Sequence, residues 1–234
     1  MQVDALISQA SRTPPTGDAT VIRAVAFDLD GTMFNTEQVF QASGIELLKR
    51  RGVDPHPQLW GRMMGRRAEE AFQAMIELCG LRDSIPELQV ESEAIFMALL
   101  DEILQPMPGL MRLLDRIEAR GLPMAVATSS TRPYLTGLLD RFDLGGRFAF
   151  TLTAEDVVHG KPHPEIYEKA ARSHGVTPSE MLVLEDSEAG TRSAATAGAH
   201  VISIPHEHSR RHDFSVAKGV AQRLDDPLIM TLLQ

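Results

Sequence analysis

Cysteine is almost missing from this chain of 234 residues, since Cys79 is the only one. A single cysteine cannot form a disulfide within the chain, so cysteine usage does not indicate an oxidising compartment. Apolar runs of about 18 residues, long enough to span a membrane as a helix, are also missing. Residues 1–20 lack the basic start and the apolar stretch of a signal peptide, and we interpret them as a flexible polar leader. These features favour a cytoplasmic protein without a membrane partner.

Positively charged residues are also fewer than negatively charged ones. The chain has 23 lysines and arginines against 32 acidic residues, which gives a formal net charge of -9. Such a surface repels the phosphates of nucleic acid, so a nucleic-acid polymer is not expected as a partner. Hydrophobic residues make up 43% of the chain, which is ordinary for a globular protein and sufficient for a buried core.

Short apolar runs alternate with helical patterns along most of the chain. The runs read as buried parallel strands, and they cover residues 23–28, 124–127, 150–152, 181–184 and 201–204. Between them, apolar residues recur at i, i+3, i+4 and i+7, first over 110–117 and again over 135–142. This alternation predicts an α/β core, a doubly wound and mainly parallel sheet of the Rossmann-like kind.

The first strand is separated from the second by about a hundred residues, far more than a crossover of roughly a dozen residues needs. Residues 36–105 carry helical periodicity throughout, and we expect them to form an inserted all-helical cap domain. Residues 21–35 and 106–234 would then form the catalytic core. Trp60 and the eleven methionines are interpreted as packing groups of cap and core, not as a cofactor site.

Four groups of polar residues follow predicted strands, at the edge where an open α/β sheet places its ligand crevice. Two are acidic pairs, one is a hydroxyl cluster at a helix start, and one is a lysine before proline. They are Asp28 with Asp30, Thr128 with Ser129 and Ser130, Lys161, and Glu185 with Asp186.

These residue types suit phosphoryl transfer, which needs a nucleophile, a proton donor and positive charge against the phosphate oxygens. A carboxylate can attack phosphorus and form an acyl-phosphate, which divides one difficult displacement into two easier ones. Hydroxyls and N–H groups at a helix start can hold phosphate oxygens. A carboxylate pair suits a hard divalent cation such as Mg²⁺, which can offset the repulsion between an acidic nucleophile and a phosphate.

In sequence order, these motifs resemble those of the haloacid-dehalogenase superfamily. They read Asp28-Leu-Asp-Gly-Thr, Thr128-Ser-Ser, Gly160-Lys-Pro-x-Pro and Glu185-Asp-Ser-x-Ala-Gly. The chain is most similar to the branch with a helical cap after the first motif, which includes β-phosphoglucomutase and many sugar-phosphate and nucleotide phosphatases. The resemblance covers residues 22 to about 205.

The resemblance also implies roles for individual residues. Asp28 would be the nucleophile, and Asp30 the general acid and base. Mg²⁺ would be held by Asp28, the backbone carbonyl of Asp30 and Asp186, with Glu185 nearby. Thr128, Ser129 and Lys161 would bind the transferring phosphoryl group.

Selectivity is expected to come from the cap. Its segments 64–71 and 90–92 look like those of pseudouridine-5'-phosphatases, and Arg62, Arg66 and Arg67 are candidates for substrate contact, although they could equally form a solvated face. Two residues depart from the family pattern: Asn35 stands where aspartate is usual, and Phe40 where β-phosphoglucomutases have histidine. The second departure argues against mutase activity.

Each motif alone also has an ordinary structural explanation. Asp28 to Gly31 could be a solvated turn, the hydroxyl cluster could cap a helix, Lys161 could lie on the surface, and the acidic pair could begin a helix. His206, His208 and His212 could form a soft-metal site, because imidazole suits Zn²⁺, but a surface loop explains them as well.

We therefore predict Mg²⁺-dependent hydrolysis of a small phosphorylated metabolite through an aspartyl-phosphate. The candidate substrates are sugar phosphates and nucleoside monophosphates, including pseudouridine 5'-phosphate. The alternatives are a sugar phosphomutase and a non-catalytic protein that binds a phosphorylated ligand. A dehalogenase would leave Asp30 and Asp186 without a role. The sequence leaves the physiological substrate and the oligomeric state open.

Overall fold

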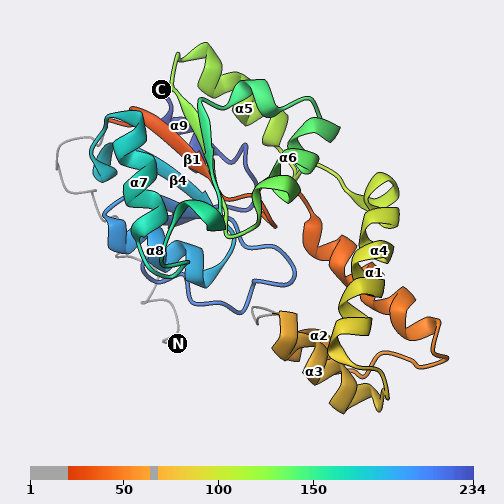
Figure 1. Cartoon of the computed structure of the whole chain (residues 1–234). Coiled ribbons are helices and arrows are strands. Elements are labelled where there is room, and N and C mark those ends of the chain that lie inside the picture. Colours follow the sequence, from red (N-terminus) through yellow and green to blue (C-terminus); the bar gives the residue numbers. More distant parts are fainter. Residues whose placement is uncertain (1–20, 64–67) are drawn as a thin grey trace, which may run out of the picture.

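Six parallel strands form one sheet at the centre of the computed structural model, which describes residues 21–63 and 68–234 (Figure 1). Their order across the sheet is β3-β2-β1-β4-β5-β6. The strands are β1 (Ala24–Phe27), β2 (Met124–Ala127), β3 (Phe150–Leu152), β4 (Met181–Glu185), β5 (His200–Ser203) and β6 (Gly219–Val220). The predicted doubly wound parallel sheet is confirmed, and the two-residue edge strand β6 is an addition to it.

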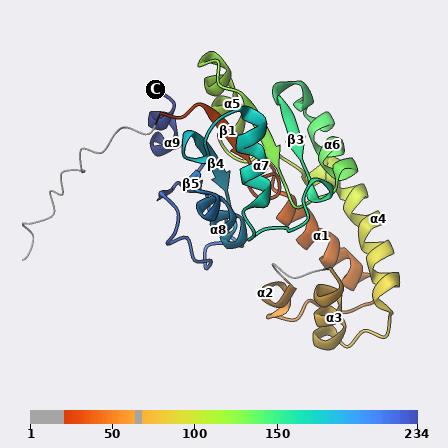
Figure 2. The same cartoon turned by 60° about the vertical axis from the view of Figure 1, so that its left-hand side comes forward.

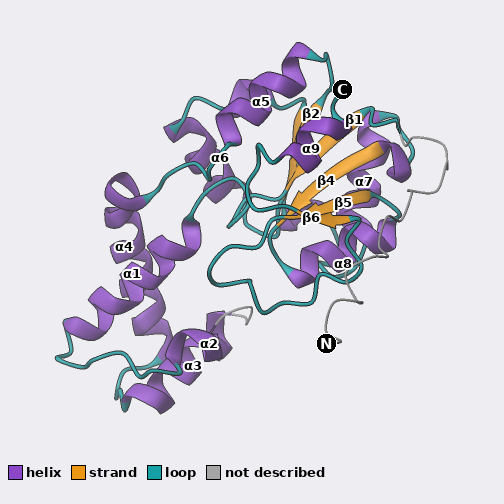
Figure 3. Cartoon of the chain, turned by 180° about the vertical axis from the view of Figure 1, so that it is seen from behind, coloured by secondary structure: helices purple, strands orange, loops and turns teal. Residues whose placement is uncertain are grey.

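Helices cover both faces of this sheet, as Figure 3 shows from behind. Five of them belong to the sheet: α5 (Leu110–Ala119), α6 (Arg132–Arg141), α7 (Glu165–His174), α8 (Glu188–Ala197) and α9 (Pro227–Leu232). Three short 3-10 turns lie between them, at Gly145–Arg147, Ala154–Asp156 and Pro178–Glu180.

Alternate residues of β1 contact different helices on the two faces of the sheet. Val25 and Phe27 point into a hydrophobic cluster with α5, α6 and α9, whereas Ala24 and Ala26 point into a cluster with α7 and α8. Successive side chains of a strand point to opposite faces, so an uninterrupted apolar run is required where both faces are covered.

The long insertion is helical in its described residues. It contains α1 (Thr36–Lys49), α2 (Leu59–Met63), α3 (Ala68–Cys79) and α4 (Ile85–Ile103), which we call the helical segment. Part of it has a hydrophobic cluster of its own, formed by residues such as Leu47, Met75 and Leu88. Figures 1 and 2 agree that this segment extends away from the sheet. Its division from the core as an independent cap domain stays a prediction.

Two linkers join the helical segment to the core, and Asn35 ties them together. The Asn35 side-chain oxygen accepts the N–H of Gln105 at 2.6 Å, and its side-chain nitrogen donates to the carbonyl of Ile103 at 3.2 Å. An aspartate could make only the first of these bonds, because a carboxylate has no hydrogen to donate. The unusual asparagine therefore strengthens the connection between the linkers.

The C-terminal stretch completes the core. Ala221, Leu224, Ile229 and Leu233 are buried in the cluster that α5 and α6 also line. No helix within the described residues is long and apolar enough to cross a membrane.

The α5 helix offers a test of this packing. Leu113 on its inner face is fully buried, whereas Met111 on the same helix is 44% exposed. We expect Leu113→Ala to lower the free energy of unfolding by about 2–5 kcal/mol through the cavity it leaves, and Met111→Ala to change it by less than about 0.5 kcal/mol. Urea unfolding measures both, and equal effects would contradict this orientation of α5.

Candidate active site

The carboxyl ends of β1 and β4 place two acids beside each other. Phe27 pairs with Leu184 in the parallel register, so the next residues, Asp28 and Glu185, leave the sheet side by side. Lys161 reaches between them: its ammonium lies 2.5 Å from Asp28 Oδ1 and 2.7 Å from Glu185 Oε1. It also donates to the carbonyl of Ala127 at 2.9 Å. The three predicted residues therefore meet in one buried contact.

Burial and charge determine the protonation of this contact. Burial raises the pKa of Asp28 well above its usual value, against the lowering effect of the Lys161 ammonium, and the nearby Glu185 and Asp186 raise it further. Burial alone would lower the pKa of Lys161, but the Asp28 and Glu185 carboxylates raise it well above the usual value. Lys161 is thus held as a cation where it can face phosphate oxygens.

Asp186 joins the same group of acids. Carboxylate oxygens of Asp28, Glu185 and Asp186 lie within 4.8 Å of one another, and all three residues are buried. One lysine cannot neutralise three carboxylates, and burial followed by repulsion from Glu185 raises the pKa of Asp186 well above its usual value. Oxygen ligands and excess negative charge are what a hard divalent cation requires, so these residues fit Mg²⁺.

Asp30 lies two residues beyond Asp28 and is held by two hydroxyl groups. Ser130 donates to its Oδ2 at 2.6 Å, and Tyr134 donates to its Oδ1 at 2.9 Å. The carboxyl group of the proposed proton donor is therefore oriented from both sides. Sequence reasoning missed Tyr134, although its position four residues after Ser130, in the first turn of α6, was a usable signal.

The predicted phosphate-binding residues line a small cavity of about 140 Å³. Thr128, Ser129 and Lys161 all contribute to its wall, together with Gly160. Thr128 is buried and accepts the N–H of Ser130 at 3.0 Å, whereas Ser129 is exposed. Thr128 and Ser129 follow a different strand from Lys161 in the sequence, and in the structure all three line the same cavity.

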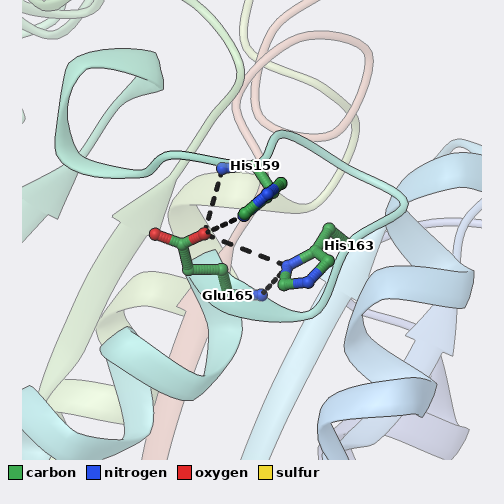
Figure 4. Close-up of side chains that lie close together, drawn as sticks. All are labelled: His159, His163 and Glu165. Carbon is green, nitrogen blue, oxygen red and sulfur yellow. Dashed lines mark hydrogen bonds and ion pairs between the residues drawn. The ribbon is translucent and has the colours of Figure 1, made fainter.

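The loop that carries Lys161 is fixed by Glu165 at the start of α7 (Figure 4). Glu165 accepts the backbone N–H groups of Val158 at 2.8 Å and of His159 at 3.0 Å. These two bonds lower the pKa of Glu165 to about 2, so the carboxylate stays ionised near neutral pH. His159 and His163 flank it, with the His159 ring nitrogen 3.1 Å from a Glu165 oxygen.

The histidines of 206–212 contact three different places. His206 Nε2 lies 2.8 Å from Asp186 Oδ2, His208 lines a larger cavity beside the helical segment, and His212 accepts the N–H of Glu188 at 3.4 Å. Among the described residues, these three do not form a group that could hold a metal ion. His206 is a second site residue that sequence reasoning did not place, because twenty positions separate it from its partner.

Comparison with known proteins agrees with this arrangement. The family model described as haloacid dehalogenase-like hydrolase matches residues 25–204, which is most of the chain. The chain belongs to this family. The predicted family is therefore confirmed.

Two curated relatives and one solved structure illustrate the match. The chain is 30% identical to the protein CbbY of Rhodobacter capsulatus, over 84% of this chain and 91% of the relative. It is 32% identical to a validoxylamine A 7'-phosphate phosphatase of Streptomyces hygroscopicus subsp. limoneus, over 80% and 87%. CbbY from Rhodobacter sphaeroides, solved in complex with phosphate, superposes with a TM-score of 0.72 at 26% identity and covers 87% of this chain and 95% of that one. These findings support the predicted phosphatase class for this haloacid dehalogenase-like hydrolase.

Of the three arginines predicted to contact the substrate, the structure describes only one. Arg62 is exposed near the end of α2 and lines neither the 140 Å³ cavity nor the larger cavity beside the helical segment. Arg66 and Arg67 lie outside the described residues. A role for any of the three in selectivity stays a prediction.

Glu185 is fully buried, and Gly190 packs directly against its carboxylate. Tyr167 donates to Glu185 Oε1 at 2.6 Å, and the Ser187 hydroxyl donates to Oε2 at 3.1 Å. A Cβ atom at Gly190, in the first turn of α8, would lie 1.8 Å from Glu185 Oε1. Only glycine allows α8 to begin this close to the carboxylate.

We expect Gly190→Ala to displace Glu185, to cost about 1–3 kcal/mol of stability through overpacking, and to abolish most activity because Lys161 loses a partner. Gly137→Ala is the matched control, because Gly137 lies inside α6 with open space where its Cβ would be. There the same change should stabilise the protein by about 0.4–1 kcal/mol. Thermal unfolding and phosphate release measure both variants, and a stable, active Gly190→Ala protein would contradict the geometry.

Proposed function

We propose that this hydrolase releases phosphate from a small phosphomonoester in two steps, with Asp28 as the nucleophile and Mg²⁺ as cofactor. One observation carries the proposal: a buried lysine, three acids and an oriented fourth acid meet at the ends of neighbouring parallel strands. Open α/β sheets bind their ligands in the crevice at the carboxyl ends of the strands.

In the first step, an Asp28 carboxylate oxygen attacks phosphorus while the bond from phosphorus to the leaving oxygen breaks. Asp30 gives its proton to that oxygen, so the leaving group departs as a neutral alcohol. Lys161 faces the charge on the phosphoryl oxygens, with Thr128 and Ser129 as hydrogen-bond donors on the same cavity wall. Asp28, Asp186 and the Asp30 carbonyl would hold Mg²⁺, which supplies positive charge between nucleophile and phosphate.

In the second step, Asp30 acts as the base. Its carboxylate takes a proton from a water molecule, the water oxygen attacks the phosphorus of the aspartyl-phosphate, and the bond to Asp28 breaks. Phosphate leaves, and both acids return to their starting states. Ser130 and Tyr134 keep the Asp30 carboxyl oriented through both steps.

The proposed substrates are sugar phosphates or nucleoside monophosphates, with pseudouridine 5'-phosphate among them, in the cytoplasm. The Streptomyces relative is named as a phosphatase of validoxylamine A 7'-phosphate, which supports a small phosphorylated metabolite as substrate. The helical segment would close over the substrate and exclude bulk water, as lids do in other enzymes. A mutase is less well supported, because Phe40 packs against Phe96 and offers no group that transfers protons.

Phosphate release from a panel of sugar and nucleoside monophosphates, with Mg²⁺ and with excess EDTA, tests the proposal. We expect release with Mg²⁺ and its loss with EDTA. Isomerised sugar phosphates in place of free phosphate would indicate a mutase. Binding without turnover would indicate a regulatory protein.

The nucleophile has its own test. Asp28→Asn should lose all turnover, because an amide cannot form the acyl-phosphate, while the far-UV circular dichroism and cooperative unfolding remain. Asp143→Asn, at an exposed position just after α6 that forms no hydrogen bond or ion pair with the described site residues, is the matched control and should keep full activity. Retained turnover in Asp28→Asn would refute the covalent scheme.

A further inference from the structure

We propose that the cavity between the helical segment and the core binds a flat, uncharged aromatic group, so that the preferred substrates are phosphomonoesters whose leaving group carries such a ring. This inference rests on the proposed phosphatase function and specifies its substrate class. The cavity has a volume of about 700 Å³, within the usual range for sites that enclose a small molecule.

Tyr134 connects this cavity to the chemistry. Its ring lines the cavity, and its hydroxyl donates to Asp30. Asp30 is the group that would protonate the leaving oxygen, so the rest of the leaving group must begin beside Tyr134. The cavity therefore receives the part of the substrate that differs from one phosphomonoester to another.

Aromatic residues are scarce in the chain, at 5%, yet they gather here. Of nine phenylalanines, two tyrosines and one tryptophan, five rings line the cavity. They are Phe40, Trp60, Phe72, Phe96 and Tyr134. Their concentration at one site is the first evidence that the occupant is aromatic, because stacked and edge-to-face ring pairs add to ordinary apolar burial.

Three of these rings form a row that starts at Asp30. The Tyr134 and Phe96 centroids are 6.0 Å apart, and the Phe96 and Phe40 centroids are 4.4 Å apart with 30° between the planes. Phe40 is 48% exposed although it is large and apolar, and Met97 beside it is 50% exposed. A ligand that covers such side chains gains free energy, because apolar surface is removed from contact with water.

Trp60 forms another part of the wall, and the backbone of α1 makes room for it. A Cβ at Gly44 would lie 2.7 Å from Trp60 Cη2, so the indole packs directly on the helix. Met63 and Met75 also line the cavity, and methionine sulfur makes favourable contacts with aromatic rings.

The acidic groups of the wall disfavour an anionic ligand. Two acids line the cavity together with four other polar residues: Glu37 and Glu93, and Gln41, Gln89, Ser92 and His208. Carboxylates there oppose a second phosphate or a carboxylate on the leaving group, whereas amides and a hydroxyl can bond to polar edges of a neutral ring. A nucleobase has this combination of flat face and polar edge.

Trp60 makes the binding directly measurable, because it is the only tryptophan in the chain. Its fluorescence is followed in Asp28→Asn with Mg²⁺, where turnover is blocked. Uridine 5'-monophosphate and ribose 5-phosphate form a matched pair, in which the base of the first is replaced by the anomeric hydroxyl of the second. We expect uridine 5'-monophosphate and benzyl phosphate to change the emission of Trp60. Both should bind at least about tenfold more tightly than ribose 5-phosphate, because one or two aromatic contacts contribute a binding free energy of that size. Equal affinities, or no response to either aromatic ligand, would overturn the proposal.

A pair of variants on α1 tests the wall in the active enzyme. Phe40→Ala removes a lining ring that is half exposed, so folding should not depend on it, and Ile45→Ala removes a side chain of similar exposure, 42%, that does not line the cavity. We expect Phe40→Ala to lower kcat/KM for uridine 5'-monophosphate about tenfold and for ribose 5-phosphate less than about twofold. Ile45→Ala should change neither.

The outcomes separate this inference from the function on which it rests. Equal losses for both substrates in Phe40→Ala would refute aromatic selection and leave the phosphatase intact. If wild-type enzyme hydrolyses no phosphomonoester with Mg²⁺, the proposed function fails, and the Trp60 titration still decides whether the cavity takes an aromatic ligand.

Discussion

The contact of Lys161 with Asp28 and Glu185 is the interaction on which the rest of the site depends. Burying a charge is costly unless an opposite charge and hydrogen bonds accompany it, and here one ammonium serves two carboxylates while Asp186 adds a third. Removal of Lys161 would leave three buried carboxylates close together with no opposite charge. The same imbalance fits the proposed chemistry, because excess negative charge would favour binding of a divalent cation and the fixed ammonium would face a substrate phosphate.

Much of the surrounding backbone serves to hold this contact in place. Asp28 and Glu185 are neighbours because β1 and β4 pair in parallel register. Glu165 fixes the Lys161 loop through two backbone N–H groups, and Gly190 lets α8 begin against Glu185. Each arrangement orients a charged group before any substrate binds, which is how preorganised sites lower the barrier of a polar reaction.

The helical segment contributes chemistry of a different kind. The core provides charge and hydrogen bonds, whereas the cavity wall provided by α1, α2, α3 and α4 is mainly aromatic and thioether surface. Tyr134 belongs to both, since its hydroxyl reaches Asp30 and its ring faces the cavity. In the proposed scheme, Tyr134 would therefore contact both the leaving group and the acid that protonates it.

Five of the six strands, the helices α5 and α6 and the residues at the strand ends could be predicted from the sequence, because apolar periodicity and strand-end motifs are local signals. The sequence predicted that Lys161 and Asp28 lie at the same end of the sheet, but not that they touch. Which strands are neighbours depends on contacts between distant segments, and no single segment determines it. Tyr134 and His206 were decided by tertiary structure, because their partners, Asp30 and Asp186, lie far away along the chain. The aromatic cavity was decided in the same way: its rings are spread from Phe40 to Tyr134, and only the packing of the helical segment beside the core brings them to one wall.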